Sequence, residues 1–204
     1  MAQWLSPAFP IGAYAYSQGL EAAIVAGDVH DAATAGNWIR AVLTHGSGRM
    51  DAIFMAQARH ADADLAALSD LALAYAASSE RAVEMLEQGT AFGLAIGAIT
   101  GAGLPALPYA LAVGVATRAF ALGTDQVAAL WLQGLAAQLV SVAVRFVPLG
   151  QTDGQRIITD MATTIVALAK ACATATLSDL GSSTVGADLA AMLHETMDVR
   201  IYRS

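Results

Sequence analysis

The spacing of apolar positions predicts a protein built almost entirely of α-helices. The clearest stretch is residues 126–146, where large apolar side chains recur at intervals of three and four residues. They are Val127, Leu130, Trp131, Leu135, Leu139, Val142 and Phe146. This spacing places them on one helical face, and the opposite face is mostly Ala, Gln and Val. A helix that is apolar nearly all round belongs in the middle of a bundle or at a subunit contact.

The same periodicity predicts nine helices after an irregular opening, and runs of alternating β-branched residues are absent. The predicted ranges are 17–26, 31–45, 50–60, 63–76, 79–100, 106–121, 125–146, 154–177 and 186–197. No repeat, charge run or linker divides the chain. The sequence therefore predicts an all-α fold, a single-domain helical bundle of roughly 8–10 helices over residues 1–204.

Several helix boundaries have a chemical signal. Gly46 and Gly48 are expected to separate two helices, and Gly123 with Thr124 offers an N-cap. Thr152 predicts a capping box, because its hydroxyl can accept the amide of Gln155 while the Gln155 side chain reaches back.

High hydrophobicity raises the question of a membrane, since 56% of the residues are hydrophobic. Residues 88–117 and 126–144 are uncharged and pass the length test for a span of roughly 20 residues. The first stretch is interrupted by glycines, Pro105 and Pro108, and the second contains Gln133, Gln138 and Ser141 among alanines. Buried core helices are favoured and no membrane is expected. A small helical membrane protein is the alternative.

Charge and cysteine content indicate which partners and which cellular compartment suit the protein. Asp and Glu total 17 against ten Lys and Arg, so nucleic acid is an unsuitable partner. The single Cys172 cannot form an intramolecular disulfide, which favours a reducing compartment. The first 20 residues have no basic region, and Pro7 and Pro10 interrupt any apolar helix there. A cytoplasmic location is expected.

Signatures of catalysis and metal binding are missing. The only lysine, Lys170, is outside any P-loop pattern, and no G-x-S-x-G motif occurs. Three of the histidines recur every 15 residues but are separated by predicted turns, and one cysteine cannot make a thiolate cage. His194 and Glu195 form the only adjacent pair of potential metal ligands. A structural or partner-contact role is favoured for them, and an unrecognised helical enzyme using this pair is the other alternative.

Three segments carry more particular patterns. Residues 4–21 read W-L-S-P-A-F-P-I-G-A-Y-A-Y-S-Q-G-L-E, residues 145–155 read R-F-V-P-L-G-Q-T-D-G-Q, and residues 194–204 read H-E-T-M-D-V-R-I-Y-R-S. In this order and from end to end, the chain resembles the UreF family of urease accessory proteins. The matching family patterns are S-P-A-F-P-x-G-x-x-x-Y-S-x-G-L-E, P-L-G-Q-T-x-x-Q and H-E-T-x-x-x-R-[LI]-[FY]-R-S. The chain departs by lacking a helical lead-in and by carrying Met-Asp-Val before Arg200.

The resemblance implies a non-enzymatic assembly factor that helps to load nickel into urease. It implies a homodimer that binds the accessory protein UreD/UreH and through it recruits the UreG GTPase and the urease apoprotein. It also implies no cofactor of its own, because nickel and GTP would be handled by the partner complex.

The opening is expected to form a stiff strap over residues 1–16, since its prolines restrict the backbone. The strap can act as a lid on the core or as a binding surface, and the resemblance implies that the region supports the fold and the dimer surface. The residues assigned to this role are Pro7, Phe9, Pro10, Gly12, Tyr16, Ser17, Gly19 and Glu21.

The central loop and the tail supply the predicted partner-binding residues. The helix start after Gly150 can receive an anionic group, or Arg145 can cap its own helix; both alternatives stay open. The tail combines arginine with tyrosine, the residue types of binding hot spots, and residues 194–204 are predicted to become ordered on a partner. The partner-binding residues are Arg145, Gln151, Thr152, His194, Glu195, Arg200, Ile201, Tyr202, Arg203 and Ser204.

Overall fold

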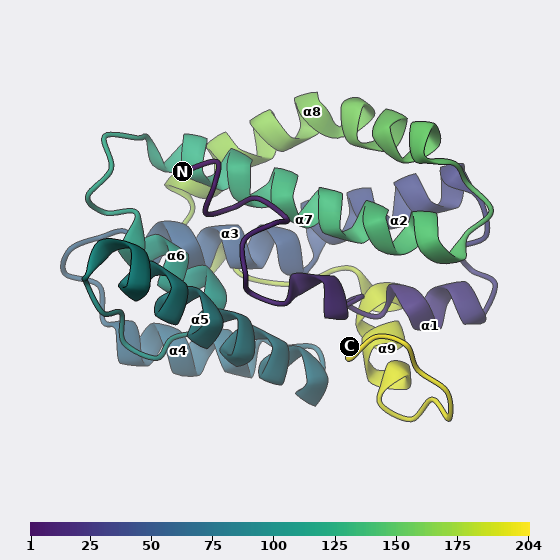
Figure 1. Ribbon diagram of the computed structural model, residues 1–204, viewed down its shortest axis with the longest axis horizontal. Coiled ribbons are helices and arrows are strands. Elements are labelled where there is room, and N and C mark those ends of the chain that lie inside the picture. The colour runs from purple at the N-terminus through teal and green to yellow at the C-terminus, as the bar shows by residue number, and fades with distance from the viewer.

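The computed structural model describes residues 1–204 and contains nine α-helices, two short 3-10 helices and no strand, which confirms the all-α prediction (Figure 1). The elements are η1 Ala13–Ala15, α1 Leu20–Val25, α2 Ala32–His45, α3 Ser47–Ala58, α4 Leu65–Ala74, α5 Ser79–Thr100, α6 Tyr109–Ala116, α7 Thr124–Phe146, α8 Gln151–Thr174, η2 Leu177–Asp179 and α9 Val185–His194.

Helix α7 is the central helix of the bundle. It lies alongside α8 and also packs against α1, α2 and α3 (Figure 1). Its side chains Val127, Leu132 and Leu139 are fully buried. Helices α7 and α8 are long and apolar enough to cross a membrane, but α7 lies inside the protein and α8 exposes Arg156 and Lys170. The structure thus places the uncharged stretch 126–144 in a core helix, as predicted.

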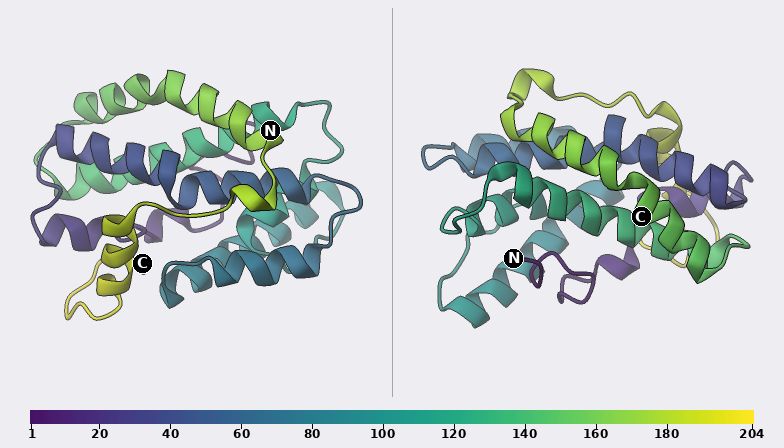
Figure 2. Two further views of the ribbon diagram at one scale, coloured as in Figure 1. Left: turned by 180° about the vertical axis from the view of Figure 1, so that it is seen from behind. Right: turned by 90° about the horizontal axis from the view of Figure 1, so that it is seen from above.

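Helix α3 joins two groups of helices. On one side it contacts α2, α7 and α8, and on the other it contacts α4 and α6 (Figure 1). The contact with α6 is close, because a Cβ atom on Gly114 would lie 2.5 Å from the carbonyl oxygen of Met55. The linker between α8 and α9, residues 175–184, runs across α3 (Figure 2, left). Arg49 and Gln57 of α3 hold it by donating to the carbonyl oxygens of Asp179 and Ala175.

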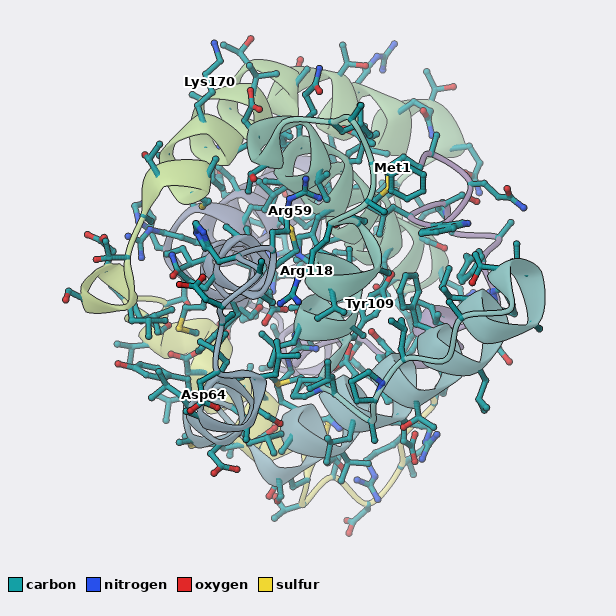
Figure 3. All side chains as sticks on the ribbon, turned by 90° about the vertical axis from the view of Figure 1, so that its left-hand side faces the viewer. Met1, Arg59, Asp64, Tyr109, Arg118 and Lys170 are labelled. Carbon is teal, nitrogen blue, oxygen red and sulfur yellow. The ribbon has the colours of Figure 1, made fainter.

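Two arginines fasten the end of α3 to the region between α6 and α7. Arg118 donates to the carbonyl oxygen of Ala58 at 2.9 and 2.7 Å. Arg59 donates to the carbonyl oxygens of Thr117 at 2.8 Å and Leu122 at 2.9 Å. Figure 3 shows both side chains in the interior of the end view. These contacts satisfy carbonyl groups that helix ends leave without partners.

Some predicted boundaries are wrong by a few residues. Helix α3 begins at Ser47, so Gly46 alone separates it from α2. Gly48 lies within α3, where a Cβ atom would come within 2.9 Å of the Cα atom of Leu43. Helix α1 begins only at Leu20, because Gln18 and Gly19 have the positive φ angles of 53° and 80°. A left-handed backbone cannot continue a right-handed helix.

The predicted capping box at Thr152 is also wrong. Helix α8 begins at Gln151, and the cap is Gly150, whose N–H donates to the carboxylate of Asp153 at 3.2 Å. Asp153 and Gln155 are alternative acceptors for two different helix starts, and a carboxylate accepts more strongly than an amide. Thr152 is therefore an exposed residue of the first helical turn.

Candidate functional site

The C-terminal tail, residues 194–204, folds back onto its own chain. The N–H of Arg203 donates to the carbonyl oxygen of Ala15 at 2.8 Å, and the N–H of Ser17 donates to the main-chain oxygen of Ser204 at 2.9 Å. Strap and tail therefore lie side by side although they are at opposite ends of the sequence. Figure 1 shows the C-terminus returning to the region of α1 and α9. The tail is thus docked on the strap and helices of its own chain, and the prediction that residues 194–204 become ordered on a partner stays a prediction.

Glu21 of α1 is the main anchor of the tail. Its carboxylate accepts the N–H groups of Ile201 and Tyr202 at 2.9 Å each, and it lies 3.1 Å from Nε2 of His194. Glu21 is only 4% exposed. Burial raises its pKa, but the hydrogen bonds from Tyr202, Ile201 and His194 favour the charged form, and the pKa is lowered on balance. The anchor is therefore an ionised carboxylate.

His194 lies between two carboxylates from different helices. It is fully buried, and its Nδ1 atom lies 2.7 Å from Glu80 of α5. Glu80 also forms an ion pair with Arg200 of the tail. One histidine and two glutamates therefore tie α1, α5 and α9 together.

The side chain of Glu195 has different partners from the side chain of His194. Its carboxylate accepts the hydroxyl of Ser79 at 2.6 Å and the N–H of Glu80 at 3.2 Å, at the first turn of α5. The hydrogen bond from Ser79 lowers the pKa of Glu195. His194 and Glu195 therefore do not converge on a common point, and no group of three or more His, Cys, Asp or Glu residues is arranged to hold a metal ion.

One face of α5 presents three carboxylates to the tail. Besides Glu80, Glu84 accepts the hydroxyl of Ser204 at 3.1 Å, and Glu87 accepts Nη2 of Arg203 at 2.8 Å. Their spacing of four and three residues places them on one face of α5. Sequence reasoning missed these three residues, although their spacing in the sequence could have shown a carboxylate stripe.

Tyr16 connects the strap to the same stripe. Its hydroxyl donates to Glu87, and the guanidinium of Arg203 lies 5.4 Å from the centre of its ring. Burial, followed by the hydrogen bond to Glu87, raises the pKa of Tyr16. The hydroxyl therefore stays protonated and serves as a donor.

A buried ion cluster lies beneath the tail. Arg81 pairs with Asp51 of α3 and with Glu84, the latter at 2.9 Å. Gln18 and Gln88 donate to the same oxygen of Glu84 at 3.1 and 3.0 Å. Sequence reasoning missed this cluster as well, because it joins side chains that are far apart in the chain.

Asp51 is the weakest charge of this cluster. Burial disfavours the charged carboxylate and raises its pKa to about 6. Arg81 lowers the pKa, but the negative charge of Glu84 opposes this effect. One guanidinium therefore has to compensate two buried carboxylates.

A cavity with a volume of about 120 Å³ lies between the strap and α7. Its walls include Arg81, Trp131, Arg145 and Tyr202. A smaller cavity of about 40 Å³ shares Asp51 and Arg81 with it. Burial raises the pKa of Tyr202, and the adjacent guanidinium of Arg145 partly offsets that rise. Arg145 thus meets the tail, whereas Gln151 and Thr152 are exposed at the start of α8.

The strap covers the core, as one of its two interpretations expects. Phe9, Tyr16 and Ser17 are buried, and the ring of Phe9 packs 5.6 Å from that of Phe92. Gly19 allows α1 to touch α9, because a Cβ atom there would lie 2.6 Å from the N atom of Ala191.

The two assigned prolines of the strap face outward. Pro7 and Pro10 are exposed, and Gly12 has the positive φ angle of 72° before η1. Their assignment to a dimer surface stays a prediction.

The residues of the strap, the tail and α5 described above bind one another, while the large apolar side chains Val185, Leu189 and Leu193 of α9 stay exposed. Exposed apolar side chains on a helical protein without a catalytic cluster are typical of a protein that acts by binding other proteins. The UreF family model matches residues 29–162. Over 204 residues, the chain is 50% identical to "Urease accessory protein UreF" of Cereibacter sphaeroides (strain ATCC 17025 / ATH 2.4.3), covering all of this chain and 97% of that protein. The proteins of the same name from Jannaschia sp. (strain CCS1) and Paracoccus denitrificans (strain Pd 1222) are 47% and 45% identical, with 93% and 94% of their lengths covered.

The chain belongs to the UreF family of urease accessory proteins. It is therefore an accessory protein and not an enzyme, in agreement with the sequence analysis.

Proposed function

We propose that the protein is a cytoplasmic homodimeric scaffold for the insertion of nickel into apo-urease. In this proposal it binds UreD/UreH and through it recruits and regulates the UreG GTPase. Membership in the UreF family supports this role. The sequence is consistent with it, because a chain without a P-loop or a metal-ligand cluster leaves GTP and nickel to its partners.

The observation that carries the proposal is an apolar surface on α9 and the tail, which we call the α9 face. It consists of Val185, Leu189, Met192, Leu193, Val199 and Ile201. Val199 is 79% and Ile201 66% exposed, while their neighbours Tyr202 and Ser204 are buried. Val185, Leu189, Met192 and Leu193 recur at helical spacing and therefore share one side of α9. Exposed apolar groups gathered in this way mark protein–protein contacts. We assign UreD/UreH to the α9 face, because the family resemblance implies that this accessory protein binds the chain directly and because the tail is the segment that we predict to bind a partner.

The exposed side of the strap is our proposed contribution to the dimer. Pro7 and Pro10 are exposed there, and Tyr14 is 78% exposed beside them. An exposed aromatic ring on a stiff backbone loses little conformational entropy on association.

The experiment is a pull-down of UreD/UreH by this chain and by two matched variants. Leu193→Glu introduces a charge into the α9 face, and Val166→Glu introduces one at an exposed position of α8. We expect Leu193→Glu to reduce the recovered partner at least tenfold and Val166→Glu to leave it unchanged. Circular dichroism checks that both variants fold. Equal recovery with all three proteins would refute the assignment of the α9 face.

Homodimer formation is tested separately by size-exclusion chromatography with light scattering. The proposal predicts twice the monomer mass for the unmodified chain and a loss of dimer on Tyr14→Glu. A monomer at all concentrations would refute this part of the proposal without affecting the assignment of the α9 face.

A further inference from the structure

The cavity between the strap and α7 is elongated. Its wall includes residues of α7 from Trp131 to Arg145. A helix rises about 1.5 Å per residue, so about 21 Å separate the Cα atoms of these two residues. The cavity volume of about 120 Å³ is far above the roughly 10–15 Å³ that a single water molecule needs. The cavity therefore has room for a narrow organic molecule along α7.

Small residues of α7 form one side of the cavity, and apolar residues of the strap form the other. Gly134, Ala137 and Ser141 recur at intervals of three and four residues, so they share one face of the helix. Leu5 and Ile11 of the strap lie opposite. A Cβ atom on Gly134 would lie 3.0 Å from the carbonyl oxygen of Leu5, so the two sides approach closely there. This shape favours a linear apolar chain over a bulky ring system.

Most polar side chains of the cavity wall already have partners within the protein. Asp51 and Arg81 pair with each other, so they offer a ligand no free charge. The side-chain amide of Gln138 donates to the carbonyl oxygen of Tyr16 at 3.1 Å. The interior of the cavity is therefore suited to an apolar group.

Arg145 is the exception, at one end of the cavity. The arginines that form ion pairs with carboxylates are Arg81, Arg156, Arg200 and Arg203. Arg145 is not among them, and its neighbour in the wall is the uncharged hydroxyl of Tyr202. Because Arg145 is exposed, a carboxylate bound to it gains charge-assisted hydrogen bonds and keeps part of its hydration.

We propose that this cavity binds a straight-chain monocarboxylate of about the length of octanoate. The carboxylate contacts Arg145, and the alkyl chain lies along Gly134 and Ala137 towards Trp131. An ester of the same acid lacks the charge that matches Arg145, so the ligand is a free acid and not the acyl chain of an intact lipid. The site goes beyond the proposed function and does not rest on it.

Calorimetric titration of the isolated full-length chain with butanoate, hexanoate, octanoate and longer acids tests the shape of the site. Burial of each methylene group should raise the affinity by up to about fourfold. We expect this rise to continue to octanoate and to stop when the chain is longer than the cavity. No binding of octanoate at millimolar concentration, or an affinity that does not depend on chain length, would overturn the proposal.

Nuclear magnetic resonance of the indole N–H groups shows where the acid binds. The Nε1 atoms of Trp131 and Trp38 are both buried without a hydrogen-bond partner, but only Trp131 belongs to the cavity wall. Octanoate should shift the signal of Trp131, which Trp131→Phe assigns, and leave that of Trp38 unchanged. Equal shifts of both signals, or no shift of Trp131, would overturn the proposal.

Two arginine variants test the charge of the ligand. Arg145→Gln should weaken octanoate binding by about tenfold or more, because hydrogen bonds between charged groups are lost, and should leave octanol binding unchanged. Arg156→Gln removes another exposed arginine, on α8, and should change neither affinity. Octanol that binds the unmodified chain as tightly as octanoate, or Arg145→Gln with unmodified octanoate affinity, would overturn the assignment.

Two alanine variants test the space itself. Ala137→Leu fills the narrow part of the cavity and should abolish binding of both octanoate and octanol, whereas Ala162→Leu at an exposed position of α8 should not. Circular dichroism checks that the variants fold. Undiminished binding by folded Ala137→Leu would overturn the proposal.

Light scattering distinguishes a small acid from a second copy of the chain as the occupant. Octanoate should leave the mass unchanged, and a dimer that dissociates on addition of octanoate would show that the cavity holds part of a second copy, which overturns the proposal. Leu193 is outside the cavity wall, so the pull-down with Leu193→Glu and the octanoate titration fail independently.

Discussion

The carboxylate of Glu21 accepts the N–H of Tyr202 at 2.9 Å, which links α1 to a residue 181 positions later in the chain. The same carboxylate accepts the N–H of Ile201. This one side chain thus accepts two main-chain N–H groups of the tail, and the strength of both hydrogen bonds depends on its charge.

Glu21→Gln should loosen the tail and destabilise the fold. The amide keeps one acceptor oxygen but loses the charge that strengthens the hydrogen bonds from Ile201 and Tyr202, at a cost of about 1–3 kcal/mol. Urea denaturation at pH 7 measures the change, with exposed Asp28→Asn as the control. Because the pKa of Glu21 is lowered by folding, its contribution is present above the ordinary carboxyl pKa and is lost as the pH falls through the folded value. Equal stability of the two variants at pH 7 would contradict the anchoring role.

The contribution of Asp51 to the free energy of unfolding should depend on pH with the opposite sign to that of Glu21. Its folded pKa is raised to about 6, so between about pH 4 and pH 6 the folded protein binds a proton that the unfolded chain has released. The free energy of unfolding contributed by this group therefore decreases as the pH rises through that window. Denaturation curves at several pH values should show that the free energy of unfolding of the wild type, relative to that of Asp51→Asn, decreases as the pH rises from about 4 to about 6. The same slope in both proteins would show that Asp51 does not titrate there.

Two glycines one turn apart in α5 should respond differently to alanine. A Cβ atom on Gly89 would lie 1.9 Å from the carbonyl oxygen of Leu107, so Gly89→Ala forces α5 away from the segment before α6. We expect a loss of at least about 1–3 kcal/mol in stability. At Gly93 the nearest atom would be Cβ of Leu104 at 3.6 Å, and Gly93→Ala should be neutral or stabilising by about 0.5–1 kcal/mol. Thermal unfolding compares the two, and similar melting temperatures would contradict the close approach of α5 to the segment before α6.

Local signals predicted the helices well, since α2, α5 and α7 have clear periodicity and strong end signals. Helix α7 occupies Thr124–Phe146 against the predicted 125–146. The predicted start of α8 is wrong because Asp153 and Gln155 each fit a capping hydrogen bond for a different first residue. The sequence alone does not show which of the two hydrogen bonds is stronger in the folded chain. The resemblance to the UreF family was confirmed by the family model and by full-length relatives.

The contacts of the tail could not be predicted from the sequence. Glu21, Glu80 and Glu84 belong to two helices, and only tertiary packing brings them to His194, Arg200 and Ser204. The motif that includes His194 and Glu195 drew attention to this pair, but the two side chains have different partners. Periodicity identifies the face of a helix, whereas the partner of that face depends on how the helices pack.

The most direct test of the central claim is urease activity in cells that express urease and its other accessory proteins but lack their own UreF protein. Expression of this chain in medium that contains nickel should restore urea hydrolysis. Urease activity with Leu193→Glu should remain near background when the variant reaches the same soluble level. No restoration by the soluble wild-type chain together with its cognate urease and accessory proteins, or full urease activity without any UreF protein, would contradict the account.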